Sequence, residues 1–306
     1  MYNETIKTRY IQEKERTTNM TDGYLKRQFN KSESFEDRLG KDISNFTVYE
    51  IEDFYKTLNI RSVESLTVLH SHLSLYTQWC LQQNLVFDCQ NHFAEIVSSS
   101  LVDYINTVAF KKSIVTKETL YKWIDDLVNP SDAFIMLALF EGIEGENYCE
   151  LFSLKMSDFN GNKVKLCTGR ELTVSSKLVA LAEESNEERE YCSLSKERKF
   201  PFLNEDLIVK NYPNCKSDGA YQKGKRIYHR VKRNFKEIGV DQYMKPKSLL
   251  DSGKIDYINT RSKELGITAK EFIYTPEYAE EVRYRFGYDL QQFKSSFVKK
   301  YGEYLV

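Results

Sequence analysis

Residues 133–140 read AFIMLALF and are apolar on every side. A helix without a polar face has to be covered all around, so this segment predicts a buried central helix. Gly142 is suited to ending it, because glycine readily adopts the left-handed conformation common just past a helix. A chain of 306 residues with 41% hydrophobic residues can bury such a helix, and its length predicts about two domains.

Two longer segments, 62–81 and 219–238, have the spacing of amphipathic helices. In each, apolar side chains recur every three or four residues, which places them on one side of a helix. The two stripes are Leu66, Leu69, Leu73, Tyr76 and Cys80 in the first segment, and Ile227, Val231, Phe235 and Ile238 in the second.

The remaining segments predict a mainly α fold with a small β-hairpin. Further helices are expected at 24–39 before Gly40, from Val48 after a Thr47–Glu50 capping box, at 91–110, after an N-cap at Thr116, and at 177–184. The hairpin is expected to pair 163–166 with 171–174, and the charged stretch 185–200 is expected to be a loop. We expect a mobile arm at 1–22, a helical domain at 23–112 and a second domain at 113–306.

The net charge of −1 excludes a simple polycationic tail, but charge is distributed unevenly. Residues 216–236 contain eight Lys or Arg and one acid, Asp218. A solvated surface helix normally interleaves acids with its bases, so this segment indicates a face for polyanions, with a plain charged surface as the alternative. A polar face on 62–81 is as consistent with base readout as with simple solvation; it carries Ser65, Thr67, His70, Ser71 and Ser74.

Residues 142–159 contain a motif, GIEGENYCELFSLKMSDF. Glu150, Leu151, Leu154 and Asp158 fit the pattern G-hydrophobic-R-x-x-E-L-x-x-L-x-x-x-D, and the chain therefore resembles the tyrosine recombinases and phage integrases. The resemblance implies a helical core-binding domain followed by an integrase catalytic-like domain. Asn147 stands at the position of the catalytic arginine.

In the family that this chain resembles, a tyrosine attacks a DNA phosphodiester while two arginines hold the phosphate oxygens and a hairpin lysine protonates the leaving group. The second catalytic motif of that family aligns with Lys247 and Leu250, and its third motif aligns with Tyr288. The position of the attacking tyrosine falls near Phe297. The resemblance therefore implies a non-catalytic scaffold that holds double-stranded DNA without cutting it.

Within this family the chain most resembles the recombinase-like master repressors of SPβ-type Bacillus prophages. This implies a prophage repressor that binds operator DNA to maintain lysogeny, with self-association through 289–306. Contacts to DNA are expected from Lys165, Arg170, Lys223, Lys225, Arg226, His229, Arg230, Arg233 and Lys247, besides the polar residues on 62–81.

Two alternatives stay open. One is an active integrase with displaced residues, in which Arg261, Arg283 or Arg285 hold the phosphate and Tyr301 is the nucleophile. The other is a regulator that works through a protein partner bound to the basic face.

No cofactor or metal is expected. The six cysteines form no C-x-x-C pair and predict reduced thiols, and His70 and His72 are two residues apart, so they do not share a helix face. The polar N-terminus and the lack of a long apolar run predict a cytoplasmic protein with no membrane segment.

Overall fold

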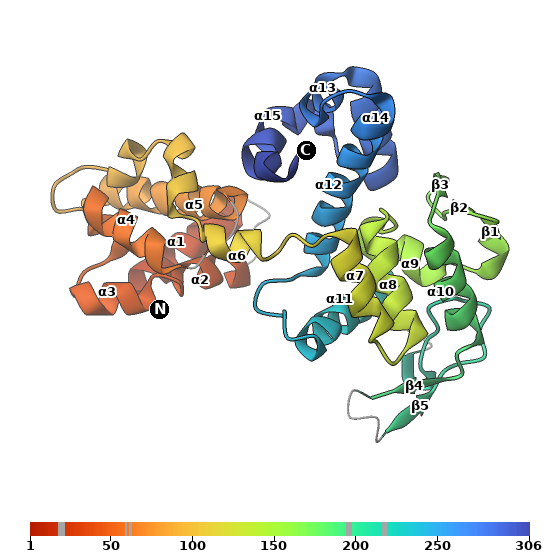
Figure 1. Cartoon of the computed structure of the whole chain (residues 1–306). Helices are drawn as coiled ribbons and strands as arrows, with labels where there is room; N and C mark the ends of the chain where they lie inside the picture. The colour runs from red at the N-terminus through yellow and green to blue at the C-terminus, as the bar shows by residue number, and fades with distance from the viewer. Residues whose placement is uncertain (18–21, 59, 61–62, 194–197, 216–218) are drawn as a thin grey trace. The chain divides into compact units, whose positions relative to one another are not determined.

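The computed structural model describes residues 1–17, 22–58, 60, 63–193, 198–215 and 219–306 (Figure 1). These residues divide into two compact units, Met1–Lys111 and Lys112–Val306. Each unit has a hydrophobic core of its own. Ser62, Lys216 and Asp218, which belong to the predicted helix and to the predicted basic segment, lie outside the described residues.

The first unit is helical. Its α-helices are α1 (Glu4–Thr17), α2 (Asp22–Phe29), α3 (Glu33–Leu39), α4 (Val48–Thr57), α5 (Val63–Gln82) and α6 (Thr107–Lys111), and its 3-10 helices are η1 (Ile43–Asn45), η2 (His92–Glu95) and η3 (Ser98–Tyr104). The apolar stripe predicted for α5 is confirmed, because all five of its side chains are fully buried. The capping box of α4 is also confirmed: the Thr47 amide donates to Glu50, and the Glu50 amide donates to Thr47.

The expected mobile arm at 1–22 is wrong for most of its length, because α1 packs into the core of the first unit. Tyr10 and Ile11 are each 1% exposed. The Lys7 ammonium is fully buried and donates to both carboxylate oxygens of Glu36 at 2.6 Å. Residues 18–21 of the expected arm lie outside the described residues.

Two helix predictions in this unit need correction. The segment 24–39 forms two helices, α2 and α3, and Gly40 ends the second in the left-handed conformation. The segment 91–110 contains the short 3-10 helices η2 and η3 before α6, where we expected one continuous α-helix.

The second unit is built around a central helix. Its helices are α7 (Lys117–Asp125), α8 (Pro130–Phe140), α9 (Cys149–Ser153), α10 (Ser176–Glu187), α11 (Ala220–Glu237), α12 (Pro246–Leu265), α13 (Ala269–Tyr274), α14 (Pro276–Phe286) and α15 (Leu290–Tyr301), with 3-10 helices η4 (Glu146–Tyr148), η5 (Met156–Asp158), η6 (Pro213–Cys215) and η7 (Gly302–Tyr304). Helices α7, α10, α11 and α12 all pack on α8. The prediction of a buried helix at 133–140 is confirmed, since every one of these side chains is at most 2% exposed.

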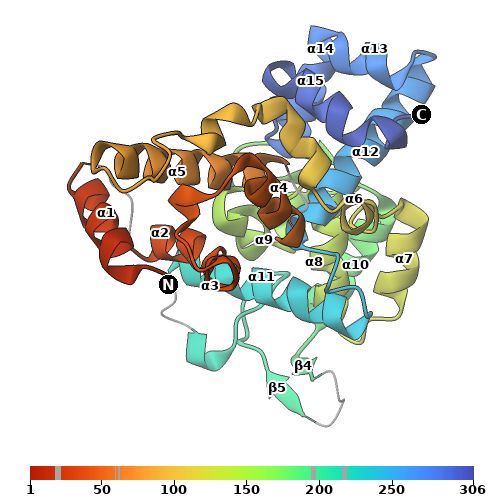
Figure 2. The same ribbon diagram turned by 90° about the vertical axis from the view of Figure 1, so that its left-hand side faces the viewer.

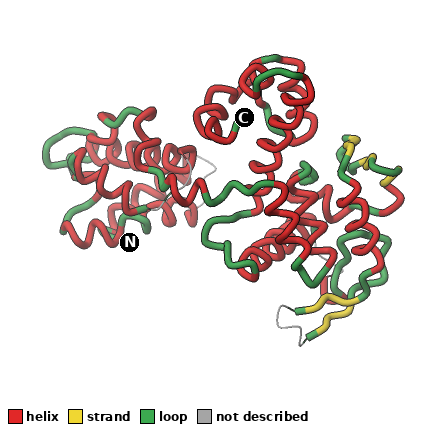
Figure 3. Tube along the Cα trace, in the orientation of Figure 1, coloured by secondary structure: helices red, strands yellow, loops and turns green. Residues whose placement is uncertain are grey.

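Within the described ranges, the strands form two small sheets (Figure 3). Strands β1 (Phe159–Asn160), β2 (Lys163–Lys165) and β3 (Glu171–Thr173) form an antiparallel sheet in that order. The predicted hairpin is confirmed in its β2–β3 pair, where buried Val164 lies opposite buried Leu172.

The expected loop at 185–200 is wrong, because α10 continues to Glu187 and a second hairpin follows. Strand β4 (Glu190–Cys192) pairs antiparallel with β5 (Lys199–Pro201). The Tyr191 side chain is only 2% exposed, so this charged stretch carries one of the buried aromatic rings of the unit. Residues 194–197 lie outside the described residues.

Helix α12 leads from α8 to the C-terminal helices α13, α14 and α15, which gather at its far end (Figures 1 and 2). None of the helices in the described ranges combines the length and apolarity needed to span a membrane.

Candidate nucleic-acid interface

Helix α11 has three faces that differ in burial. The apolar stripe Ile227, Val231 and Phe235 is at most 2% exposed. This stripe belongs to a helix that packs on α8, α9 and η4. The opposite side, here called the outward face, consists of Lys225, His229, Lys232 and Lys236, which are all exposed. Their spacings of four, three and four place them on one line along the helix.

The outward face carries three lysines and a histidine. Among the residues that the structure describes, none of its four side chains forms an ion pair with a carboxylate. An exposed row of lysines along one helix produces a local positive potential although the whole chain carries a net charge of −1. Such a row complements the negative charge of a nucleic-acid backbone.

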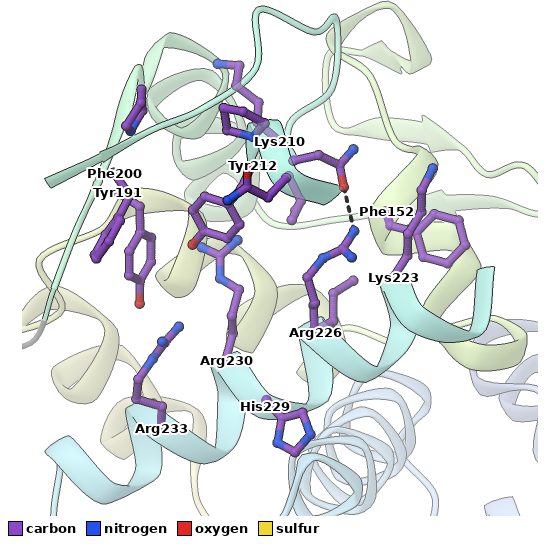
Figure 4. A pocket seen from close by; sticks show the side chains of 16 residues that line it. Phe152, Tyr191, Phe200, Lys210, Tyr212, Lys223, Arg226, His229, Arg230 and Arg233 are labelled. Atoms are coloured by element: carbon purple, nitrogen blue, oxygen red, sulfur yellow. Dashed lines mark hydrogen bonds between the residues drawn. The ribbon is translucent and has the colours of Figure 1, made fainter. Parts of the chain in front are cut away.

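A third face of α11, here called the pocket face, carries Lys223, Arg226, Arg230 and Arg233. These residues line a pocket of about 620 Å³ whose other walls come from β4, β5, residues 209–214 and Phe152 (Figure 4). Arg230 and Arg233 point from α11 toward Tyr212 and Tyr191, and Arg226 points toward Asn211, to which it donates at 2.8 Å. The basic residues that looked equivalent in sequence are therefore divided between two environments.

Arg230 is buried and serves the fold. Its Nε donates to Asp132 at 2.8 Å, its Nη2 donates to Ser131 at 2.6 Å, and the side chain is only 5% exposed. The expected phosphate contact by Arg230 is therefore contradicted, because its guanidinium is taken up by a buried partner on α8. The other pocket-face cations are more accessible: Lys223 and Arg226 are partly buried and Arg233 is exposed.

The polar residues of α5 divide in a similar way. Ser65 and Ser71 are exposed, and Thr67 is partly buried and donates to the Val63 carbonyl at 2.9 Å. Ser74 is partly buried and accepts a hydrogen bond from Asn91 at 3.3 Å.

His70 does not belong to an exposed polar face. It is 7% exposed, and its Nδ1 lies 2.7 Å from the Tyr55 hydroxyl. Burial lowers the pKa of His70, so the neutral ring is favoured. The expected contact of His70 with DNA is contradicted, because the ring is packed between Tyr55 and Phe93.

Arg170 holds the motif segment together. Its guanidinium binds the fully buried Glu150 carboxylate, with Nε and Nη2 donating at 3.0 and 2.5 Å. It also donates to the carbonyls of Gly142, Tyr284 and Arg285. The structure thus places Arg170 between the motif and α14, and its expected contact with DNA is not supported.

Two lysines of the first sheet remain exposed. Lys165 and Lys163 lie on β2, where the alternation along a strand turns them away from buried Val164. The Lys163 ammonium lies 3.9 Å from Glu171 across the hairpin.

Asn147 lies against the basic helix. It is exposed and left-handed, with φ 51° and ψ 34°, a conformation that asparagine tolerates better than most residues. A side chain on Gly224 of α11 would overlap the carbonyl of Asn147, so α11 and η4 approach each other closely. The position that holds an arginine in the recombinase pattern is therefore next to α11 but carries no charge.

The residues that align with the second catalytic motif of the recombinases begin at the N-terminus of α12. Lys247 is exposed there, whereas Leu250 is 5% exposed and part of the core. One turn later the Lys254 ammonium lies 2.8 Å from Asp251 and 4.3 Å from the centre of the Tyr288 ring. The buried cation at this end of α12 is thus paired within the protein.

The C-terminal aromatic residues are buried. Phe297 and Tyr301 are 1% and 3% exposed, and their ring centres are 4.7 Å apart. Burial alone would raise the pKa of Asp251, but the Lys254 ammonium and hydrogen bonds from Lys254 and Tyr301 outweigh it and keep that pKa low. The Tyr301 hydroxyl therefore faces a charged carboxylate inside the protein.

The three arginines of the displaced-integrase alternative are each beside carboxylates. Arg261 donates to Glu264 at 2.6 Å and to Glu281 at 3.2 Å, and Arg283 donates to Glu280 at 3.3 Å. Arg285 lies 3.8 Å from Glu141 and donates to the Thr173 carbonyl at 2.9 Å. These guanidiniums are engaged by groups of the protein itself.

Sequence reasoning missed two sets of site residues. Lys232 and Lys236 share the outward face, and their four-residue helical spacing with Lys225 and His229 was the available signal. The pocket aromatics Tyr191, Phe200 and Tyr212 gave no such signal, because the stretch around them is charged and irregular.

Both units match one family. Residues 1–82 match the family described as "MrpR, N-terminal core-binding domain", and residues 114–301 match "MrpR, C-terminal catalytic domain". The chain belongs to the MrpR family. This membership agrees with the resemblance drawn from the motif at 142–159, whose two expected domain types are both present.

A relative from Bacillus subtilis (strain 168), the SPbeta prophage-derived uncharacterized protein YopR, is 24% identical to this MrpR-family chain over 283 residues. The match covers 87% of this chain and 84% of the relative. Among solved structures, a lambda integrase dimer bound to a COC' core site matches at 13% identity and a TM-score of 0.51, covering 98% of this chain and 78% of that one. This MrpR-family chain therefore has a tyrosine-recombinase-like, mainly helical fold.

Proposed function

We propose that the chain is a non-catalytic, sequence-specific protein that binds double-stranded DNA. The observation that carries this proposal is the outward face of α11, an exposed row of cations free of acidic partners among the described residues. Lys225, Lys232 and Lys236 would contact phosphates and set the position of the protein on the duplex. Lys165 and Lys247, both exposed, and the partly buried Lys223 and Arg226 would add further phosphate contacts.

The absence of catalysis rests on what occupies the recombinase positions. Asn147 and Leu250 carry no charge, and Leu250 and Phe297 are buried. Removing one preorganised donor from a site that stabilises a developing anion typically costs a factor of about 10² to 10³ in rate. A scaffold without either phosphate arginine retains DNA affinity and loses strand cleavage.

The finer part of the proposal is a prophage repressor that binds operator DNA and maintains lysogeny. The prophage origin of the relative YopR and the DNA core site bound by the lambda integrase dimer support it. Base contacts would come from the exposed Ser65 and Ser71, with Thr67 and Ser74 beside them on α5. Self-association through 289–306 is part of the same proposal and agrees with the dimeric state of lambda integrase in that structure.

The salt dependence of DNA binding tests this function. Each phosphate contact contributes a slope of about −0.9 in a plot of log K against log salt for duplex DNA. Replacing Lys225, Lys232 and Lys236 by alanine should therefore make the slope shallower by roughly 2.7 and weaken binding to all duplex sequences alike. The control replaces three exposed lysines on other helices, Lys122, Lys263 and Lys270, and should leave the slope nearly unchanged.

Two outcomes would contradict the proposal. A covalent protein–DNA adduct trapped with a suicide substrate, and lost in Tyr301→Phe, would establish an active recombinase. If the protein shifts no duplex fragment in an electrophoretic mobility assay at low salt, the result would favour the remaining alternative, a regulator whose basic face binds an acidic protein.

A further inference from the structure

We propose that the pocket beside α11 binds a free nucleotide, an anion joined to a flat aromatic ring. Its volume of about 620 Å³ falls within the range of roughly 300–1,000 Å³ usual for small-molecule sites. All of its walls belong to the second unit (Figure 4). Lys223 and Arg226, given supplementary DNA contacts above, line this pocket, as does His229 at the border of the outward face, whereas Lys225, Lys232 and Lys236 do not.

Aromatic rings form one side of this pocket. Tyr212 is stacked against Phe202 at 5.3 Å between ring centres and meets Tyr191 edge-on at 6.0 Å, so its ring is held in a fixed orientation. Phe200, on β5, is 44% exposed at the pocket wall, and Phe152 lies on the other side of the pocket. Faces of fixed aromatic rings bind nucleobases by stacking, whichever base is present.

Cations form the opposite side. Five of the sixteen lining residues are Lys or Arg, and no Asp or Glu occurs among the lining residues that the structure describes. Arg230 is neutralised by Asp132 behind it, and the Lys210 ammonium donates to backbone carbonyls, including that of Glu188 at 2.9 Å. Lys223 and Arg233 leave a positive charge around the pocket, which complements a phosphate.

The geometry separates this site from the three lysines of the outward face, whereas His229 lies at the border and also lines the pocket. Residues on a helix advance by roughly 100° each, so Arg226 and Arg233 point about a quarter turn away from Lys225 and Lys232. The guanidinium of Arg233 lies 5.0 Å from the centre of the Tyr191 ring, and Arg226 donates to Asn211 at 2.8 Å. Arg233 is thus directed toward the aromatic side of the pocket, where a single ligand would contact ring and cation together.

Occupancy of the pocket would also affect the outward face, a consequence that rests on the proposed function. A bound phosphate places negative charge beside α11 and reduces the potential that attracts DNA. Because linkage between two ligands is reciprocal, DNA would weaken nucleotide binding by the same factor. The pocket would then act as the site of a small-molecule inducer.

Isothermal titration calorimetry of the full chain tests the ligand. The probes are AMP, GMP, CMP and UMP, with adenosine and inorganic phosphate as half-ligands. At least one nucleotide should bind about tenfold more tightly than adenosine or inorganic phosphate, because only a nucleotide can contact both the aromatic rings and the cations. Phe200→Ala and Arg233→Ala should each weaken it roughly tenfold, the size of one stacking or charge-assisted contact. The control Lys232→Ala, on the outward face, should keep full nucleotide affinity.

The pocket assignment is overturned if none of the four nucleotides binds at millimolar concentration, or if the two pocket variants bind as wild type does. Displacement of the nucleotide by duplex DNA, together with an equal loss of DNA affinity in Phe200→Ala, would overturn the assignment to a free ligand. Nucleotide binding that persists in a protein unable to bind duplex DNA would support the pocket and reject the proposed function. Thermal unfolding of each variant checks that it is folded.

Discussion

At the scale of single residues, the arginines of this chain divide into those that hold the fold and those that face a ligand. Arg170 and Arg230 bind the buried carboxylates of Glu150 and Asp132, and each also bonds other groups around it. Arg233, by contrast, is exposed at the edge of the pocket. The same residue type on the same helix therefore has different roles, decided by whether a carboxylate stands behind it.

Arg230→Ala should lower the free energy of unfolding of the second unit far more than Lys232→Ala does. Removing one partner of a buried ion pair leaves the other charge uncompensated and typically costs about 3–5 kcal/mol. Lys232 is exposed two residues away on the same helix, so its replacement should change the free energy of unfolding by less than about 0.5 kcal/mol. Urea unfolding of both variants measures the difference. Equal stability of the two would show that the Arg230–Asp132 pair does not support the fold.

His70 should make the first unit less stable in mild acid. Its pKa is lowered in the folded state by burial, whereas the unfolded chain takes up a proton near pH 6.5. The stability it contributes is therefore present above that pH and lost as the pH falls below it. His70→Gln should flatten the decline of the unfolding free energy between pH 7.5 and about 5.

His92 provides the opposite control. Burial would lower its pKa, but hydrogen bonds to Asp88 and Glu95 outweigh this and raise it. Its contribution to stability is present at low pH and is lost as the pH rises through the raised pKa. His92→Gln should therefore make the loss of stability toward acid steeper. A pH profile of His70→Gln identical to that of wild type would show that the buried ring does not control the acid response.

At the scale of elements, close contacts between helices fix where the interface residues stand. Gly253 of α12 packs directly on the carbonyl of Phe140 at the end of α8, and Gly224 of α11 packs on the carbonyl of Asn147. Neither glycine has a left-handed backbone conformation. Each is needed because a side chain at its position would overlap the facing backbone. They hold α11 and α12 against α8 and η4.

Gly253→Ala should destabilise the second unit, although alanine favours a helix more than glycine does. The new methyl group would displace α12 from α8, and overpacking of this kind typically costs about 1–3 kcal/mol. Gly23→Ala on α2 is the matched control, because the nearest atom to its methyl group would be an arginine side-chain nitrogen at 3.8 Å. The control should be neutral or stabilising by up to about 1 kcal/mol. Chemical unfolding that ranks the two variants in the reverse order would contradict the close packing of α12 on α8.

At the scale of the whole molecule, the chain consists of two units with separate cores. The core of the first unit uses side chains from Tyr10 to Leu101, and the core around α8 uses side chains from Val115 to Leu250. The start of the second unit is tied to its own body, since the Val115 amide donates to Ser252 at 3.0 Å. Neither core includes side chains from the other unit.

The fragment Lys112–Val306, produced alone, should therefore fold and unfold cooperatively. Its midpoint in urea should match the transition of the second unit in the full chain, because every described side chain of the core around α8 belongs to the fragment. Far-UV circular dichroism and tryptophan fluorescence from Trp123 measure this transition. A fragment that is unfolded or aggregated in buffer would show that the second unit depends on Met1–Lys111 for its stability.

Much of the fold could be predicted where apolar periodicity was strong. The helices α5, α8 and α11 were predicted because each needs one buried stripe or a fully buried surface, and these patterns are visible in the chain itself. Helix α1 was missed because its buried side of Lys7, Tyr10 and Ile11 contains a charge. The β4–β5 hairpin was missed because β4 buries only Tyr191 and the residues around it are charged.

The sequence by itself determined the mainly helical class, the recombinase-like motif and the uncharged residue at Asn147, since these depend on residue type and spacing alone. Only the tertiary structure decided which basic residues of α11 face outward and which face a pocket or a buried acid. It also decided that His70 and Arg170 serve the fold. The physical reason is that a cation is available to a ligand only if no carboxylate or carbonyl distant in sequence is packed against it, and such pairings arise only when the chain is folded.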